Sequence, residues 1–397
     1  MLHRFGLPLL LLWIALPASA QQVPVKGTDA TLDVATWNIK QFGSASSSAQ
    51  QIDNVRDVIE QAGIDLWAIQ EITDPDDFDR LLADLGDGYN GVLAASGSLR
   101  IGYIYKTDVI RVRAAQHILE NLRASNGATL FAGRPPLQIE VDVLLPDTTV
   151  VMTFITLHMK CCGDSSSYTR RLEASQRLKN RIDFTLLDRE PVVVLGDFND
   201  ELGQSISGGR TSPYQNFLAD STDYAFLTLP LDQQNIGTFC NNALCTSGST
   251  LDHILITDEL FTAYEAGSAD RFDELVSSIS NYRSSTSDHL PVFARFRFGT
   301  RTDVEAEAVP AAVAVRPAYP NPFRRSSTLA YTLSRPVAVR VEVFDLLGRR
   351  VATLVDGFQA TGEHRATFDA GDLPPGLYLM RFRAGDVVHV QRVVHLR

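Results

Sequence analysis

Residues 191–199 read Pro-Val-Val-Val-Leu-Gly-Asp-Phe-Asn, and the fold expected of this chain follows from that pattern. Pro191–Leu195 is an apolar run of the length of a buried strand, and Gly196 then permits a tight turn. Asp197 and Asn199 come directly after the turn. Because α/β folds place polar chemistry at the ends of buried strands, we expect both side chains at the rim of a sheet.

Five further motifs combine an apolar run with polar side chains in the same way. Together with two helical stretches they predict an α/β fold built as a two-sheet sandwich. The motifs are Thr36-Trp37-Asn38, Gln70-Glu71, Leu157-His158, Leu251-Asp252-His253 and Ser287-Asp288-His289. The expected strands include Leu32–Trp37, Leu66–Gln70, Ile101–Tyr105, Val150–Thr156, Pro191–Leu195, Leu251–Ile256 and Val292–Phe298, and the expected helices Asn54–Ala62 and Arg170–Leu187.

The residue types of these motifs indicate one kind of chemistry. Each motif alone has an ordinary explanation, such as a turn, a helix cap or a surface hydrogen bond, but six in order are hard to explain in that way. Amide and carboxylate oxygens bind Mg²⁺, Mn²⁺ or Ca²⁺, and a histidine beside a carboxylate transfers protons. Phosphodiester hydrolysis needs both functions. The chain has no Walker loop and no His-Glu-x-x-His, which disfavours a nucleoside-triphosphatase or a zinc protease.

In this order the motifs resemble the endonuclease/exonuclease/phosphatase superfamily, whose best-known secreted member is deoxyribonuclease I. The resemblance covers about residues 30–298 and implies a four-layer, two-sheet α/β sandwich. Asp53-Asn54-Val55-Arg56-Asp57 and Phe131-Ala132-Gly133-Arg134-Pro135-Pro136 resemble the deoxyribonuclease branch in particular.

The resemblance also implies a role for each motif residue. Asn38, Glu71 and Asp288 would hold the metal ion, with Mg²⁺ or Mn²⁺ expected and Ca²⁺ as a further candidate. Asp197 and Asn199 would position the attacking water and the scissile phosphate, and Asp252 would orient His289 for acid–base work. His158 would be a second acid–base group or a phosphate ligand, and Arg134 would contact a substrate phosphate.

One departure from the deoxyribonuclease pattern concerns His158. That branch pairs its first histidine with a Glu just before the strand expected at Ile101–Tyr105, but Ser98-Leu99-Arg100 contains no Glu. The role of His158 therefore stays open, and Arg100 is either a phosphate contact or a solvated strand end. His253 lies on the opposite strand face from Asp252, so we expect a structural role for it.

The two ends of the chain indicate export. His3 and Arg4 precede the apolar run Leu7–Leu16, and Ala18-Ser19-Ala20 offers a cleavage site, so residues 1–20 are predicted to be a signal peptide. The alternative, a buried N-terminal helix, is disfavoured by two prolines within the segment. No other run is long enough to span a bilayer.

Residues 317–397 form the second expected domain, a small all-β sandwich that follows the catalytic domain (29–299) and an Ala/Val/Glu-rich linker (300–316). Tyr319-Pro320-Asn321-Pro322-Phe323, Val343–Arg349 and Pro374–Tyr378 resemble the type IX secretion sorting domain of Bacteroidetes-type bacteria. This resemblance implies the type IX machinery as a partner and a secreted or cell-surface location. The alternative, a carbohydrate-binding accessory domain, would need more aromatic side chains for sugar stacking.

Charge and cysteines add two limits. The formal net charge is −11, which excludes a DNA-storage protein but not a nuclease whose cleft is neutralised by cations. The pairing of Cys161, Cys162, Cys240 and Cys245 stays open between a Cys240–Cys245 bridge with a vicinal Cys161–Cys162 bridge and cross-pairing of the two segments.

We expect a secreted, monomeric, divalent-metal-dependent phosphodiesterase, an endonuclease acting on extracellular nucleic acid, with DNA expected and RNA as a further candidate substrate. One alternative is a sphingomyelinase-like lipid phosphodiesterase, which would need an exposed aromatic hairpin for membrane insertion. Phe217–Pro230 is the candidate for such a hairpin, and its acidic residues make it a poor one. The other alternative is a non-catalytic surface-binding module.

Overall fold

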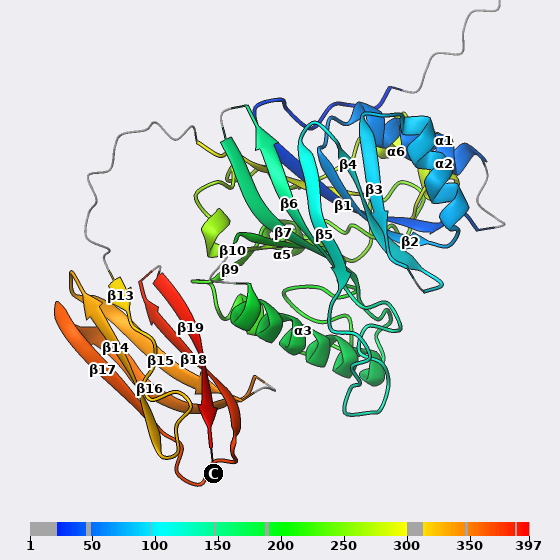
Figure 1. Ribbon diagram of the computed structural model, residues 1–397. Helices are drawn as coiled ribbons and strands as arrows, with labels where there is room; N and C mark the ends of the chain where they lie inside the picture. Colours follow the sequence, from blue (N-terminus) through cyan, green and yellow to red (C-terminus); the bar gives the residue numbers. More distant parts are fainter. Residues whose placement is uncertain are drawn as a thin grey trace, which may run out of the picture.

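The structure is a computed structural model that describes residues 22–44, 49–95, 97–146, 148–186, 190–299, 313–345, 348–385 and 387–396. The predicted signal peptide (1–20) and residues 300–312 of the predicted linker lie outside these ranges. The larger part of the chain contains two six-stranded mixed sheets, and the C-terminal part contains only strands (Figure 1).

The first sheet has the strand order β11-β12-β1-β2-β4-β3. Its central strand β1 runs parallel to β2 and antiparallel to β12. The strand β1 is buried over its first eight residues, because one face packs on the second sheet and the other on helices. The strands are β1 Leu32–Phe42, β2 Leu66–Ile72, β3 Tyr89–Leu93, β4 Arg100–Lys106, β11 Asp270–Arg271 and β12 Val292–Phe296.

The second sheet has the strand order β5-β6-β7-β8-β10-β9. Strands β7 and β8 are parallel, and β10 is antiparallel to β8. All six residues of β8 are buried, as the uninterrupted apolar run before Gly196 predicts. The strands are β5 Ile110–His117, β6 Leu137–Leu145, β7 Thr148–His158, β8 Val192–Asp197, β9 Tyr224–Phe226 and β10 Asp252–Thr257.

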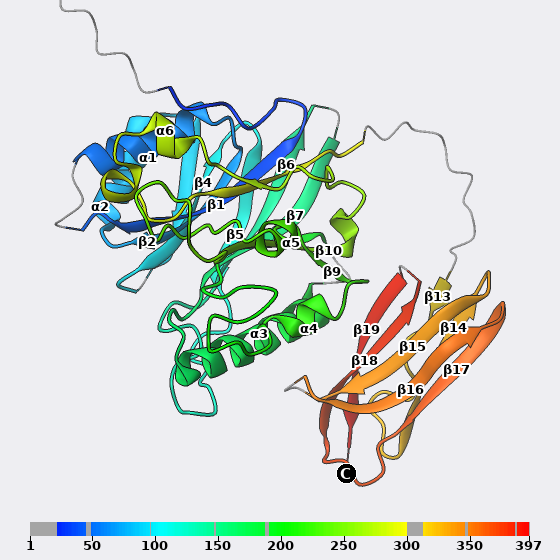
Figure 2. The same cartoon turned by 180° about the vertical axis from the view of Figure 1, so that it is seen from behind.

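Helices cover the outer faces of the two sheets, which gives the predicted four-layer sandwich (Figures 1 and 2). Side chains such as Val34, Phe154 and Leu195 fill the space between the sheets. Trp37 instead packs with α1 outside the first sheet, and Leu178 of α3 packs outside the second. The helices are α1 Ala49–Gln61, α2 Pro75–Leu85, α3 Ser165–Thr185, α4 Gln215–Leu218, α5 Leu229–Gln233, α6 Leu275–Ser278 and α7 Tyr282–Ser285, with a 3₁₀ turn at Asp258–Leu260.

Two helices begin earlier than the sequence predicts. The helix α1 starts at Ala49 rather than Asn54, and the Gln51 amide in its first turn donates to the carbonyls of Ile39 and Thr286. The helix α3 starts at Ser165, where Asp164 caps it by accepting the Ser167 N–H. In both helices the first residue is determined by hydrogen bonds of polar side chains and not by the helical spacing of apolar residues on which the sequence prediction relied.

The C-terminal part is an all-β pair of sheets, as predicted. A three-stranded sheet (β13-β14-β17) and a four-stranded sheet (β16-β15-β18-β19) enclose a core that includes Phe323, Val341 and Phe382. No helix in the part of the chain that the structure describes is long and apolar enough to cross a membrane. The strands are β13 Val313–Val315, β14 Ser326–Leu333, β15 Val337–Phe344, β16 Arg350–Gln359, β17 Gly362–Asp369, β18 Gly376–Ala384 and β19 Val387–His395.

Candidate active site

The predicted site residues come together around Asp197, the last residue of β8. In the parallel pairing of β7 with β8, His158 is the partner of Asp197, and in the antiparallel pairing of β10 with β8 the partner is Asp252. Asn38 of β1 reaches across from the other sheet, and its Nδ2 donates to Asp197 Oδ2 at 3.0 Å. Residues of both sheets therefore meet at one edge of the sandwich.

Local backbone features hold this edge together. At Gly196 a Cβ would lie 2.1 Å from the Leu157 carbonyl oxygen, so only glycine allows β7 and β8 to approach this closely. Glu71 has a φ of 68°, and the pairing of β2 with β4 is irregular there. A non-glycine residue in this left-handed region is costly and is often retained at functional sites.

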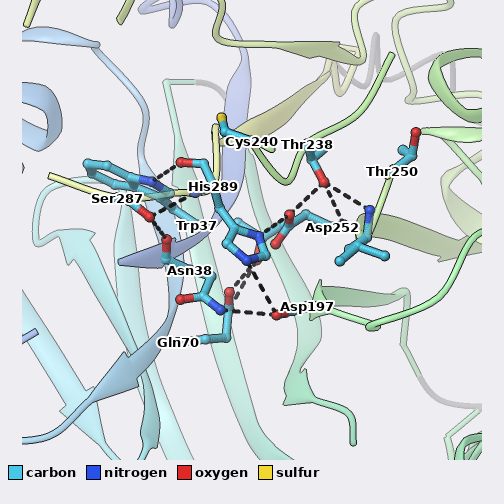
Figure 3. Close-up of polar contacts among 12 residues, drawn as sticks. Trp37, Asn38, Gln70, Asp197, Thr238, Cys240, Thr250, Asp252, Ser287 and His289 are labelled. Atoms are coloured by element: carbon cyan, nitrogen blue, oxygen red, sulfur yellow. Dashed lines mark hydrogen bonds and ion pairs between the residues drawn. The ribbon is translucent and has the colours of Figure 1, made fainter. Parts of the chain in front are cut away.

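His289 and Asp252 form a tightly bonded pair (Figure 3). The His289 Nδ1 lies 2.7 Å from Asp252 Oδ2, and the same carboxylate oxygen accepts the Thr238 hydroxyl at 2.6 Å. The backbone N–H of His289 donates to the Ser287 hydroxyl at 3.0 Å, and the Ser287 hydroxyl donates to the backbone carbonyl of Asn38 at 2.6 Å. The imidazole is thus fixed in position, and its Nε2 faces Asp197 Oδ2 at 4.0 Å.

His158 approaches Asp197 from the other side without a comparable partner. Its Nε2 lies 3.5 Å from Asp197 Oδ2 and 3.9 Å from Glu71 Oε1. Its Nδ1 is buried and has no hydrogen-bond partner among the residues that the structure describes. The deoxyribonuclease branch pairs this histidine with a Glu, and none of the side chains that the structure describes takes the place of that Glu beside His158.

The electrostatics of the three central groups differ strongly. Burial, followed by the charge of Asp252, raises the pKa of Asp197 to about 7. Burial opposes protonation of His289, but the charge and hydrogen bond of Asp252 outweigh it and raise the pKa of His289 to about 10. Burial, together with the charges of Arg134 and His289, holds the pKa of His158 well below its ordinary value. At neutral pH His289 is therefore a cation and His158 is neutral.

Of the predicted metal ligands, Asn38 and Glu71 contact each other, whereas the Asp288 side chain is paired with Lys40. Asn38 Nδ2 is 3.1 Å from Glu71 Oε1, and Glu71 Oε2 accepts the Gln41 N–H at 3.1 Å. Asp288 is half-buried, and its Oδ2 lies 3.5 Å from Lys40 Nζ. A second group of potential ligand atoms, on Asp197, Asp252 and His289, gathers within 4.8 Å. Because Asp252 and His289 are already hydrogen-bonded to each other, we interpret this second group as a proton-transfer set.

The sequence was compared with protein-family models. The model described as the Endonuclease/Exonuclease/phosphatase family matches residues 35–289, and the Secretion system C-terminal sorting domain matches residues 317–395. The chain belongs to the endonuclease/exonuclease/phosphatase family. The sorting domain indicates export to a secreted or cell-surface location. No curated protein matches the chain.

The chain is similar to several solved structures, and a similarity with a TM-score above 0.5 shows the same fold. An endonuclease/exonuclease/phosphatase from Bacteroides vulgatus is 16% identical with a TM-score of 0.51, and the match covers 68% of this chain and 99% of that one. A family protein from Bacteroides thetaiotaomicron is 17% identical with a TM-score of 0.49, covering 68% and 98% of the two chains. An AP endonuclease from Archaeoglobus fulgidus is 19% identical with a TM-score of 0.48, covering 67% and 100%.

The remaining predicted residues of this family member fall into two groups. Asn199 and Arg134 lie at the site, since Asn199 Nδ2 and Arg134 Nη2 both donate to the Met159 carbonyl, at 3.2 and 3.1 Å. Arg100 donates to the Gly97 carbonyl at 3.3 Å and, within the described ranges, forms no hydrogen bond or ion pair with a site residue. His253 is buried between Thr228 and the Asp200 carbonyl, consistent with the structural role expected for it.

Three residues that support the site were not assigned a role from the sequence. Thr238 bonds Asp252 from 14 residues away in the chain, and no motif around it signals this contact. Ser287 belongs to the Ser287-Asp288-His289 motif, so its position in the sequence could have indicated that it supports the site. Arg171 is fully buried in α3 and donates to the carbonyls of Lys160 and Cys162, which follow β7.

Proposed function

We propose that this protein is a secreted, divalent-metal-dependent phosphodiesterase that cleaves nucleic acid as an endonuclease. The observation that carries the proposal is the convergence of a buried His289–Asp252 pair and Asp197 with Asn38 and Glu71 at one edge of the sandwich. A carboxylate with a pKa of about 7 beside a protonated imidazole is suited to accept and to donate a proton at neutral pH.

The chain's own residues would divide the reaction as follows. Asp197 Oδ2 accepts the proton of the attacking water, which Asn199 helps to position. His289 donates its Nε2 proton to the departing oxygen as the phosphorus–oxygen bond breaks, and Asp252 stabilises its cation and holds its tautomer. Neutral His158 and cationic Arg134 contact the phosphate oxygens, a role supported by the position of His158 beside Asp197.

A divalent cation fits beside these groups. Asn38, Glu71 and Asp288 offer the oxygen donors that Mg²⁺ and Mn²⁺ prefer, and Ca²⁺ stays a further candidate. Besides burial, the charges of Asp252 and Glu71 raise the pKa of Asp197, which supports a cation bound near these carboxylates. When bound, the metal would supply neutralisation of the phosphate charge.

The structure of residues 217–230 favours nucleic acid over a lipid substrate. Phe217, Tyr224 and Phe226 are buried and pack on one another in the core outside the second sheet. They cannot serve as the exposed aromatic hairpin that a sphingomyelinase-like enzyme would insert into a membrane. The intact set of expected metal ligands, Asn38, Glu71 and Asp288, disfavours a non-catalytic binding module.

Supercoiled plasmid DNA is the most direct test substrate, because it has no ends and is nicked only by an endonuclease. We expect the purified mature chain to nick it with Mg²⁺ or Mn²⁺, to lose this activity in excess chelator and to regain it when metal is restored. Single-stranded DNA, RNA and sphingomyelin vesicles should be assayed in parallel, with His289→Ala as the inactive control. Nicking that persists in chelator would overturn the metal requirement, and hydrolysis of sphingomyelin alone would establish the lipid alternative.

A further inference from the structure

Two adjacent cysteines follow β7 at the border of the candidate active site. Cys240 and Cys245 are bonded to each other and are buried, which excludes cross-pairing. Cys161 is half-buried and Cys162 is exposed, and their Sγ atoms lie 2.7 Å apart. That separation is within about 0.7 Å of the length of a disulfide bond.

We propose that Cys161 and Cys162 form a reversible vicinal disulfide, a redox modification site that changes the charge presented to the substrate phosphate. The part of the proposal that concerns substrate rests on the proposed function, whereas the bond itself does not. Cys162 has a φ of 82°, so the backbone already adopts an unusual conformation at the point where the two side chains meet.

The surroundings of the pair favour thiol–disulfide exchange. Lys160 Nζ lies 3.1 Å from Cys161 Sγ. Burial opposes ionisation of Cys161, but the hydrogen bonds of Cys162 and Lys160 and the charges of Lys160 and Arg134 outweigh it and lower the pKa of this thiol. Since the thiolate is the nucleophile in exchange, Cys161 is the attacking group.

The oxidant is a low-molecular-weight disulfide of the glutathione class, and the exchange takes two steps. The Cys161 thiolate attacks one sulfur of that disulfide, forming a mixed disulfide and releasing one thiolate. Cys162 then attacks the Cys161 sulfur, which forms the Cys161–Cys162 bond and expels the second thiolate. The protein dithiol loses two electrons, and the two thiol protons end on the two released thiols. Export through the sorting domain is consistent with an oxidising surrounding.

The cysteine pair follows directly on a segment that two proposed site residues contact. Arg134, proposed to contact phosphate, donates to the Met159 carbonyl at 3.1 Å, two residues before Cys161, and Asn199 donates to the same carbonyl at 3.2 Å. In the dithiol form Cys161 Sγ accepts a hydrogen bond from Lys160, and ionisation of this thiol, which its lowered pKa favours, offsets the positive charges of Lys160 and Arg134. In the disulfide form that negative charge is gone, so both cations act fully on the substrate phosphate.

We therefore expect oxidation to lower KM for plasmid DNA about five-fold, the size of one charge–charge contact near water, with little change in kcat. The matched control is the double variant Cys161→Ser/Cys162→Ser. It carries no thiolate, so its KM should equal that of the oxidised protein and should not respond to reductant.

The bond is tested separately by mass spectrometry. The full mature chain is equilibrated with oxidised or reduced glutathione, alkylated and digested. After oxidation, the peptide with Cys161 and Cys162 should be unalkylated and lighter by two hydrogen atoms. Mild reduction should make both residues alkylatable, while buried Cys240–Cys245 stays bonded.

Two results would overturn the proposal. Full alkylation of Cys161 and Cys162 after oxidation would show that the bond does not form. Bond formation with an unchanged KM would show that it does not control substrate binding. Loss of all phosphoester hydrolysis under every condition would instead refute the proposed function, while the peptide mass would still decide whether the bond exists.

Discussion

His289 and His158 both face Asp197, but at neutral pH His289 is a cation and His158 is neutral, because their surroundings differ. Asp252 raises the pKa of His289 to about 10, whereas burial and nearby cations keep His158 neutral. His158 also lacks a described hydrogen-bond partner at Nδ1. The two histidines should therefore contribute differently to turnover, although they are nearly equally distant from Asp197.

Alanine substitution should separate the two roles. His289→Ala should lower kcat by roughly 10²–10⁴-fold, because it removes the proton donor. His158→Ala should cost less in kcat and more in KM, because a neutral imidazole that mainly binds the phosphate contributes to substrate affinity. Steady-state kinetics on one substrate and one metal measure both effects. Equal kcat losses with unchanged KM values would show that His158 is a full acid–base group.

The Asp252→Asn substitution should shift the pH dependence of kcat/KM. Asp197 must be ionised and His289 protonated, so activity should rise as Asp197 loses its proton near pH 7 and fall as His289 loses its proton near pH 10. Asp252 raises both pKa values. Removing its charge should therefore move both limbs of the profile to lower pH and reduce the maximum.

Thr238→Val is a control for this shift, because it keeps the Asp252 charge but removes the Thr238 hydroxyl, which donates to Asp252 Oδ2 and accepts the backbone N–H groups of Leu251 and Asp252. Its alkaline limb should move much less than that of Asp252→Asn. An alkaline limb that stays in place in Asp252→Asn would mean that His289 is not the group that titrates there.

At the scale of elements, α3 holds the segment after β7 in place. Arg171 on α3 forms a fully buried ion pair with Asp200, with Nε 2.9 Å from Oδ2. Its Nη1 donates to the carbonyls of Lys160 and Cys162, and its Nη2 donates to the Ser207 hydroxyl at 2.8 Å. One side chain thus joins α3 to the two segments that follow β7 and β8.

Arg171→Met should lower the free energy of unfolding by about 3–5 kcal/mol, because it leaves the buried Asp200 carboxylate without its cation. Denaturant titration followed by circular dichroism measures this change. Arg80→Met is the control, since the exposed Arg80–Asp84 pair on α2 should contribute less than about 1 kcal/mol. If both variants lose a similarly small amount of unfolding free energy, the hydrogen bonds that remain at Asp200 stabilise its carboxylate without Arg171.

At the scale of the whole molecule, the site and the export signal lie in separate parts of the chain. The family match at residues 35–289 contains every proposed site residue, and the sorting-domain match begins at residue 317. The C-terminal part contacts the rest through Arg381, whose Nη1 lies 3.5 Å from Asp183 on α3, and through Arg383 to Asp223. Neither contact involves a proposed site residue.

Deletion of residues 317–397 should therefore leave kcat nearly unchanged and abolish export. Activity of the purified truncated protein and activity in the culture medium of cells that express it measure the two effects. Secretion that persists while hydrolysis is lost would mean that the C-terminal part belongs to the working enzyme.

Much of this protein is determined locally by its sequence. The buried strands β8 and β10 follow from short apolar runs with polar ends, which carry Asp197 and Asp252. The ordered motifs also predict that Asn38, Glu71, His158 and His289 belong to the same site. Their roles stay predictions, as do the domain boundaries at 29–299 and 317–397. Strand periodicity and turn residues act over a few positions, so they can be read without knowing what packs against them.

Only the tertiary structure decided how these residues act on one another. Asn38 and Asp197 are 159 positions apart and meet because two sheets pack face to face. Thr238 contacts Asp252 from 14 positions away, and Gln51 in the first turn of α1 contacts Thr286, which is 235 positions away. The pKa values of Asp197 and His289 also follow from burial and from charges brought close by packing. Such effects depend on distance in space, which separation along the sequence does not specify.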